Sequence, residues 1–118
     1  MLAYVGDAVY ELIVREQIAE QNHTDVSKAH KSAVTHVSAE AQSKAMRAMV
    51  ASGFVTAEEE AVFKRARNHR SMSKPQHADP RDYKVATGFE ALIGWLHLEG
   101  NVERAREIAL EAIRLTSE

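Results

Sequence analysis

The chain has 118 residues, with 15 lysines and arginines, 17 aspartates and glutamates, and a formal net charge of −2. This length predicts one domain with a buried core, and the apolar content of 45% is that of an ordinary globular protein. The absence of cysteine excludes disulfides, thiolate nucleophiles and zinc ribbons, and it fits a reducing cytoplasm. No apolar run is long enough to cross a membrane. The near-neutral charge means that any nucleic-acid site must be a local feature.

The apolar residues follow a helical period almost throughout, so the sequence predicts an all-α helical bundle. Ser38 and Thr56 have the features of N-caps, and Gly53 stands where a helix would end. Acidic residues follow Thr56, as in a capping box. Two prolines and clustered polar residues predict a loop over residues 68–82. The predicted helices cover residues 2–21, 25–33, 39–51, 57–67, 83–98 and 102–115.

Asp7 lies among apolar residues in the first predicted helix, which begins LAYVGDAVYE. On a helical wheel this helix has two apolar faces, and Asp7 falls within the second of them. A helix of that kind is expected to be buried, and a buried carboxylate must be paired, protonated or bound to a metal ion. Two interpretations are therefore open, a salt bridge with a basic residue of another helix or a ligand for a cation.

Glu90 lies beside the apolar face of the helix predicted over 83–98, in the stretch YKVATGFEALIGWLHL. Its neighbours one turn away, Ala86, Thr87 and Gly94, are small, so a second helix could approach Glu90 closely. Two acids on two long helices suggest a shared Mg²⁺ site, because Mg²⁺ takes oxygen ligands and often binds only one or two carboxylates. The alternative is that the glycines serve packing alone and Glu90 is a solvated residue at the helix edge.

A basic segment runs from residue 64 to residue 84, with seven lysines and arginines against two aspartates. Such a segment near an acidic site suits a polyanion whose backbone is to be cut, and the alternative is a solvated loop. We expect phosphate contacts from this segment and from a weaker basic cluster in the second helix, with an asparagine placing the loop. The expected contact residues are Lys31, Arg65, Arg67, Asn68, Arg70 and Lys74.

Two motifs resemble the signatures of the ribonuclease III family. LAYVGDAVYE is similar to the first signature, which is built around LGDAV, and ATGFEALIGWLHLE is similar to the second, an EALIG helix. Together with their order, their separation and the stretch KRARN, they indicate the Mini-III branch, a catalytic domain without an appended double-stranded-RNA-binding domain. The resemblance covers nearly the whole chain, so it implies one catalytic domain over residues 1–118 with the all-α ribonuclease III fold.

The resemblance implies a homodimer that hydrolyses double-stranded RNA with Mg²⁺, or with Mn²⁺ in its place, and that takes part in maturing large-subunit ribosomal RNA. The family's catalytic, metal-binding aspartate and glutamate fall on Asp7 and Glu90. Ala3 and Thr87 stand where larger ribonucleases III carry two further acids. That departure keeps a second interpretation open, a related dimer that binds RNA but cleaves it weakly or not at all.

A third interpretation is an all-α, metal-dependent nucleotide hydrolase. Such an enzyme needs clusters of acids that face each other from neighbouring helices. The run Glu58, Glu59 and Glu60 is better explained as negative charge at the positive end of a helix. The sequence therefore favours a ribonuclease over a nucleotide hydrolase.

Overall fold

The computed structural model describes residues 1–21, 24–69 and 79–117, and these residues form six α-helices without a β-strand. The all-α prediction is confirmed. None of the helices in the described ranges is long and apolar enough to cross a membrane. The helices are α1 (Leu2–Glu20), α2 (Val26–Val37), α3 (Ala39–Ser52), α4 (Ala57–Arg67), α5 (Pro80–Leu98) and α6 (Val102–Thr116).

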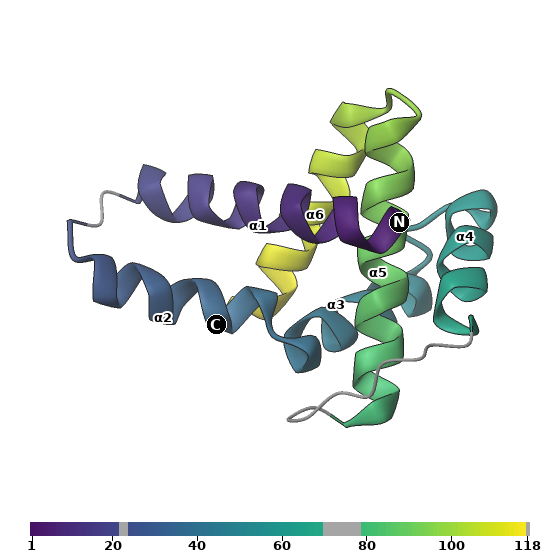
Figure 1. Ribbon diagram of the computed structural model, residues 1–118, viewed down its shortest axis with the longest axis horizontal. Helices are drawn as coiled ribbons and strands as arrows, with labels where there is room; N and C mark the ends of the chain where they lie inside the picture. Colours follow the sequence, from purple (N-terminus) through teal and green to yellow (C-terminus); the bar gives the residue numbers. More distant parts are fainter. Residues whose placement is uncertain (22–23, 70–78, 118) are drawn as a thin grey trace.

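Helix α5 lies at the centre of the molecule, and α1, α3, α4 and α6 pack against it (Figure 1). The N-terminal part of α1 crosses α5, and α4 runs alongside α5 (Figure 1). Helix α2 returns along α1 and packs on it, away from α5. Residues from three different parts of the chain therefore meet at the middle of α5.

The core is built from the apolar faces of helices that pack on α5. The rings of Tyr10 and Phe89 meet edge to face, with their centroids 4.9 Å apart. The predicted core face of α5 is confirmed, because all its members are buried: Val85, Phe89, Leu92, Ile93 and Leu96. Each large apolar side chain buried in this way stabilises the fold by about 1.5–3 kcal/mol. The position of α5 is thus fixed along most of its length.

Three predicted helix ends are confirmed by their local geometry. Ser38 begins α3, and its hydroxyl accepts a hydrogen bond from the backbone N–H of Ala41. Gly53 ends α3 with a φ of 75°, a left-handed conformation that glycine adopts without strain. Thr56 and Glu59 form the predicted capping box at the start of α4, in which each side chain accepts the backbone N–H of the other.

Two predicted boundaries were wrong. Helix α2 continues to Val37 instead of ending near residue 33, because no glycine or proline interrupts it before Ser38 begins the next helix. Helix α5 begins at Pro80, inside the predicted loop, because Asp79 caps it by accepting the backbone N–H of Arg81. Proline suits the first turn of a helix, where its missing N–H has no intrahelical partner to lose.

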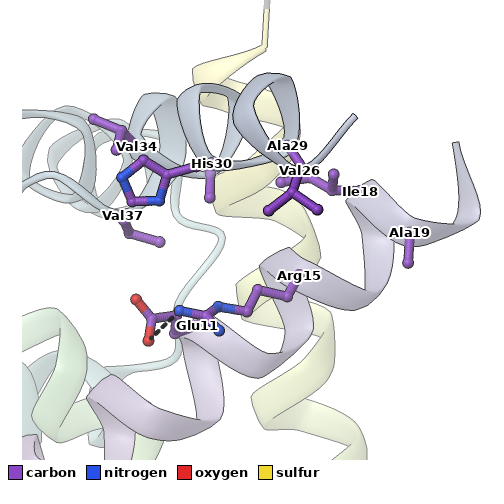
Figure 2. A pocket seen from close by; sticks show the side chains of 10 residues that line it. Glu11, Arg15, Ile18, Ala19, Val26, Ala29, His30, Val34 and Val37 are labelled. Carbon is purple, nitrogen blue, oxygen red and sulfur yellow. Dashed lines mark ion pairs between the residues drawn. The ribbon is translucent and has the colours of Figure 1, made fainter. Parts of the chain in front are cut away.

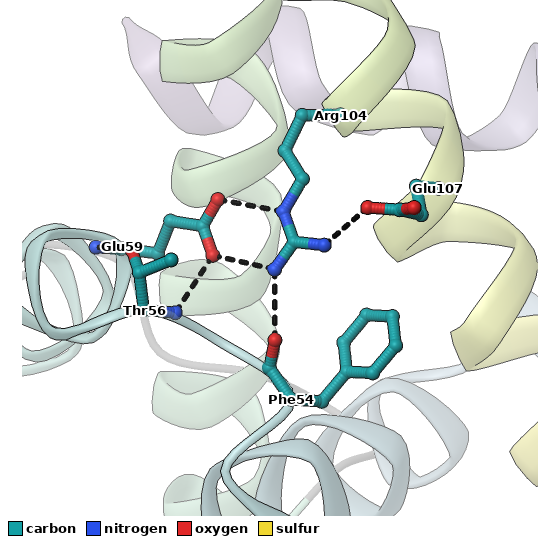
Figure 3. A network of polar contacts seen from close by, with 5 residues as sticks. All are labelled: Phe54, Thr56, Glu59, Arg104 and Glu107. Carbon is teal, nitrogen blue, oxygen red and sulfur yellow. Dashed lines mark hydrogen bonds and ion pairs between the residues drawn. The ribbon is translucent and has the colours of Figure 1, made fainter.

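Arg104 ties α6 to α4 through a largely buried ion pair (Figure 3). Its Nε donates to Glu59 Oε2 at 2.8 Å, and its Nη2 donates to Glu59 Oε1 at 2.9 Å and to the carbonyl oxygen of Phe54 at 2.8 Å. The hydrogen bonds from Arg104 hold the pKa of Glu59 below its ordinary value. Glu60 pairs with a lysine of the next turn at 2.7 Å. These acids of the Glu58–Glu60 run have structural partners, which agrees with their interpretation as helix-end charge.

Candidate active site

Helices α1 and α5 touch backbone to backbone at two glycines. A Cβ placed on Gly6 would lie 1.6 Å from the carbonyl oxygen of Glu90, and one placed on Gly94 would lie 2.0 Å from the carbonyl oxygen of Leu2. Only glycine permits so close an approach of two helices at both positions. The small residues beside Glu90 therefore do admit a second helix, and Asp7, which follows Gly6, is brought to Glu90.

The carboxyl groups of Asp7 and Glu90 interact directly across this crossing. Burial, followed by the negative charge of Asp7 and by hydrogen bonding between the two carboxyl groups, raises the pKa of Glu90 to about 8. The charge of Glu11, one turn after Asp7, acts in the same direction. Like charges held this closely favour protonation of one of them. A cation between the two carboxylates would remove that repulsion.

The burial of Asp7 differs from the prediction, and the burial of Glu90 agrees with one of its two interpretations. Asp7 is exposed, although the helical wheel placed it on a buried face, and Glu90 is partly buried, although one interpretation made it a solvated edge residue. The face of α1 that carries Asp7 is covered only further along the helix: Tyr10, Val14 and Ile18 are buried, whereas Asp7, near the start of the helix, is exposed. Among the described residues Asp7 forms no ion pair with a basic residue, so these residues give the salt-bridge interpretation no support.

Gln42 of α3 also belongs to this site, and the sequence analysis missed it. Its Nε2 donates to Glu90 Oε2 at 3.3 Å and to the carbonyl oxygen of Val37 at 3.0 Å. Gln42 is 2% exposed and shares the buried side of α3 with Met46 and Met49. A polar residue four and seven positions before two core methionines was the signal that could have revealed it.

The two positions noted for their missing acids contribute no ligand. Ala3 carries no ligand atom in its side chain, and the hydroxyl of Thr87 donates to the carbonyl oxygen of Tyr83 at 2.9 Å. Within the described ranges no group of three or more histidines, aspartates and glutamates could hold a metal ion. The side-chain ligands available at the crossing are thus the carboxylates of Asp7 and Glu90.

The two carboxylates fit a Mg²⁺ site better than a zinc site. Two carboxylates, one exposed and one partly buried, fit Mg²⁺, which keeps several waters and needs few protein ligands. They do not fit zinc, which takes three or four nitrogen, sulfur or oxygen ligands from the protein. The raised pKa of Glu90 comes first from burial and then from the negative charge of Asp7, and a cation at this point would offset both effects.

The structure places four of the expected RNA-contact residues on two separate helices. Lys31 is exposed on α2, and Arg65 is exposed near the end of α4. Arg67 lies over a phenylalanine ring at 5.4 Å and donates from Nε to Asn68 Oδ1 at 3.1 Å. Asn68 is the C-cap of α4, at the point where the predicted loop begins. In the described ranges none of the four is bonded to Asp7 or Glu90.

The rest of the expected basic loop is described only at its two flanks. Arg70 and Lys74 lie outside the described residues. Arg81 and Lys84 are exposed in the first turns of α5. The end of α4 and the start of α5 lie at the same end of the molecule (Figure 1). Both flanks of the segment therefore present cations at that end.

A groove of about 330 Å³ lies between α1 and α2 (Figure 2). The apolar side chains that line it come from both helices and include Ile18, Val26, Val34 and Val37. Glu11 and Arg15 form an ion pair of 3.5 Å at its α1 side (Figure 2). Val26 is 82% exposed, and Leu12 of the neighbouring helix is 58% exposed. These two helices thus carry apolar surface that the protomer leaves uncovered.

Known proteins are similar to this chain in sequence and in fold. The family model described as the ribonuclease III domain matches residues 1–101. The chain is 43% identical to the Mini-ribonuclease 3 of Enterococcus faecalis, over 99% of this chain and 89% of that protein. It is also 43% identical to the Mini-ribonuclease 3 of Clostridium tetani, over 100% of this chain and 78% of that protein. A crystal structure of a Fusobacterium nucleatum protein superposes with a TM-score of 0.82 at 27% identity, over 96% of this chain and 88% of that chain.

Proposed function

The chain belongs to the Mini-ribonuclease 3 branch of the ribonuclease III family, and from that premise we propose a Mg²⁺-dependent endonuclease that hydrolyses double-stranded RNA. The observation that carries the proposal is the meeting of Asp7 and Glu90 at the backbone contact of α1 and α5. Two carboxylates on rigid, crossing helices form a fixed pair of oxygen ligands. Such a pair can hold a divalent cation against a phosphate group.

Each residue of the proposed site has a role that follows from its position. When bound, the cation supplies Lewis-acid chemistry, which lowers the pKa of water and stabilises charge on the leaving 3′ oxygen. Glu90 would supply a ligand oxygen from the partly buried side of the site, and Asp7 would supply one from the exposed side, where RNA could approach. Gln42 donates to Glu90 from behind and thereby stabilises its ionised form. Mn²⁺ takes similar oxygen ligands and should replace Mg²⁺.

We expect the RNA to be held mainly by its backbone. Duplex RNA presents its phosphates, its 2′-hydroxyls and its shape rather than a readable major groove. The proposed phosphate contacts are Lys31, Arg65, Arg67, Arg70 and Lys74, with Asn68 shaping the end of α4. Lys31 and Arg65 are exposed on different helices, so a ligand that contacts both must extend over the surface. A long polyanion meets that condition.

We propose a homodimer as the functional form. Helix α1 has two apolar faces, and the protomer leaves part of the first uncovered, because Leu12 is 58% exposed although Ile13 beside it is buried. Leu12 of α1 and Val26 of α2 are exposed, and a second copy of the chain would cover this surface. Two-fold assembly through one patch is the commonest form of oligomer.

The proposed biological role is the maturation of large-subunit ribosomal RNA in the cytoplasm. Its support is the resemblance of both motifs to the Mini-III branch, together with relatives named Mini-ribonuclease 3. The cysteine-free sequence suits a reducing compartment.

A cleavage assay on duplex RNA tests the proposed activity. The purified chain is incubated with perfectly paired RNA in Mg²⁺, in Mn²⁺ and in EDTA, with a nucleoside triphosphate as the control substrate. We expect cleavage of the RNA in Mg²⁺ and Mn²⁺, no cleavage in EDTA, and no hydrolysis of the triphosphate. Duplex RNA that is bound but stays intact in both metals would contradict the proposed nuclease activity and favour an RNA-binding dimer. The missing acids at Ala3 and Thr87 are the observation that keeps this alternative open.

A further inference from the structure

A buried glutamine stands in an otherwise apolar part of α3. Gln42 is 2% exposed, and its neighbours along the buried side of the helix are Ala45, Met46 and Met49, which are all 0% exposed. A buried amide is costly unless its hydrogen-bonding groups have partners. The amide Oε1 has no partner among the described residues, whereas Nε2 has two. The stabilising contribution of Gln42 therefore comes from its donor atom.

The orientation of this amide is fixed by the backbone. Nε2 donates to the carbonyl oxygen of Val37 at 3.0 Å, and a carbonyl oxygen can only accept. Turning the amide over would place Oε1 against that carbonyl, with two acceptors in contact. Nε2 therefore stays on the side of Val37, and on the same side it meets Glu90 Oε2 at 3.3 Å. Gln42 is a fixed hydrogen-bond donor aimed at one oxygen of Glu90.

The surroundings of Glu90 on its own helix give its carboxylate little other support. Ala86 and Gly94, one turn away on either side, are too small to confine a long side chain. The hydroxyl of Thr87 is directed to the backbone of its own helix, at 2.9 Å from the carbonyl oxygen of Tyr83. Glutamate loses considerable rotamer freedom when it is fixed. Its carboxylate must therefore be oriented from outside α5.

On the basis of the proposed function, we propose that Gln42 is a positioning residue that holds the Glu90 carboxylate in place to share a cation with Asp7. Its hydrogen bond engages Oε2 of Glu90 and restricts the carboxylate to one orientation. A ligand that is already oriented loses less entropy when the metal binds. Outer partners of this kind contribute to metal affinity although they never touch the metal.

The test compares Gln42→Met, which removes the donor and keeps the length of the side chain, with the parent protein. Without RNA, Mn²⁺ binding is followed by the electron paramagnetic resonance signal of free Mn²⁺. We expect Gln42→Met to weaken Mn²⁺ binding about 10-fold to 100-fold, the usual range for lost outer partners of a metal site. The Mg²⁺ concentration for half-maximal RNA cleavage should rise by the same factor. At saturating Mg²⁺ the kcat and the KM for RNA should return close to those of the parent.

Ser43→Ala is the matched control for loss of a buried hydrogen bond. Ser43 is 1% exposed, it is the next residue of the same helix, and it also bonds to α5, at 2.8 Å from Asp82 Oδ1. We expect this variant to melt at a lower temperature while Mn²⁺ affinity and the Mg²⁺ requirement stay unchanged. If Gln42→Met does not fold, Gln42→Asn takes its place, because it keeps a buried amide but withdraws it from Glu90 by one methylene.

The outcomes separate the two proposals. Suppose that the parent binds Mn²⁺ and cleaves RNA, and that a folded Gln42 variant binds Mn²⁺ as tightly as the parent. That outcome overturns the positioning role and leaves the proposed nuclease activity intact. Equal losses of Mn²⁺ affinity in the Gln42 variant and in Ser43→Ala also overturn it, because the effect would then be general loosening of α3 against α5. A parent that neither binds Mn²⁺ nor cleaves duplex RNA overturns the nuclease, and the positioning role with it.

Discussion

The carbonyl oxygen of Glu90 lies 1.6 Å from the point that a Cβ on Gly6 would occupy. Non-bonded carbon and oxygen atoms cannot approach that closely, so Gly6→Ala must move α1 away from α5. We expect this variant to lose RNA cleavage, because Asp7 moves with α1, and to lose at least about 1–3 kcal/mol of folding free energy, the usual cost of overpacking. Thermal melts and the cleavage assay measure both effects.

Gly53→Ala is the control for a glycine replaced where there is room. A Cβ at Gly53 would meet no atom within 4 Å, but the φ of 75° strains any other residue by about 1–2 kcal/mol. This variant should melt earlier and still cleave RNA. Full activity of Gly6→Ala at an unchanged melting temperature would show that the helix contact does not set the site.

Asp7→Asn and Glu90→Gln should each abolish Mg²⁺-dependent cleavage while the fold is kept. Above the raised pKa of Glu90 both carboxyl groups are ionised and repel each other in the absence of metal, so at such a pH either variant should be at least as stable as the metal-free parent. The parent should gain about 2.7 kcal/mol from Mg²⁺ at a hundred times its dissociation constant, and the variants should gain less. Thermal melts with and without Mg²⁺ measure this. The metal site would be ruled out if the variants melted far below the metal-free parent and the melting temperature of the parent did not change with Mg²⁺.

The stability of the metal-free protein should depend on pH through Glu90. Burial and the charge of Asp7 raise the pKa of this carboxyl from 4.5 to about 8 in the folded chain. Between these values the folded chain keeps a proton that the unfolded chain releases, so the free energy of unfolding should fall as the pH rises through this window. Glu90→Gln should remove that component. Urea unfolding in EDTA at several pH values measures the slope of both proteins.

The comparison of parent and variant is needed because another group acts in the opposite direction. Burial lowers the pKa of His36 from 6.5, so this residue makes the free energy of unfolding rise with pH just below that value. The contribution of His36 is present in both proteins and cancels in their difference. A difference that does not change with pH would contradict the raised pKa of Glu90.

Binding of duplex RNA should weaken with salt, and removal of one phosphate contact should reduce that dependence. Lys31→Ala and Arg65→Ala should each weaken binding in EDTA and lower the slope of log affinity against log salt by about one unit. The same is expected of Arg70→Ala and Lys74→Ala. Arg114→Ala on α6, which removes a cation already paired with Glu111 at 2.7 Å, should leave the slope unchanged. If Lys31→Ala, Arg65→Ala, Arg70→Ala and Lys74→Ala all kept the slope of the parent, the proposed phosphate contacts would be contradicted.

Light scattering should give twice the 13.1 kDa mass of one chain at micromolar concentration. Leu12→Asp should produce folded monomers, because Leu12 is 58% exposed in the protomer and lies on the face of α1 that a second copy would cover. Leu98→Asp is the matched control, since Leu98 is also 58% exposed but ends α5. A parent that scatters as a monomer would contradict the proposed assembly.

The sequence predicts the helices better than it predicts what covers them. Local signals are strong at helix ends, where Ser38, Gly53 and Thr56 each need only their own neighbours to act, and those ends are confirmed. The exposure of Asp7 could not be predicted, because a helical wheel shows which faces of a helix are apolar but not how far along the helix the protomer covers them. The acids themselves were found as a pair because their motifs are specific.

Gln42 illustrates what local patterns leave out. Its role depends on Glu90, 48 residues later, and on the carbonyl oxygen at the end of the preceding helix. Neither contact follows from the helical period of α3. The start of α5 at Pro80 could not be predicted from local pattern either, because proline is common both in loops and at the first position of a helix.

The junction of α2 and α3 consists of a single residue, Ser38, which ends one helix and begins the next. Val37, just before it, lines the groove with its side chain and accepts the hydrogen bond of Gln42 with its carbonyl oxygen. No loop separates the two helices that could absorb a displacement. A shift of α2 by whatever fills the groove therefore carries the Val37 carbonyl with it, and the amide that bridges this carbonyl to Glu90 must follow or break one of its bonds.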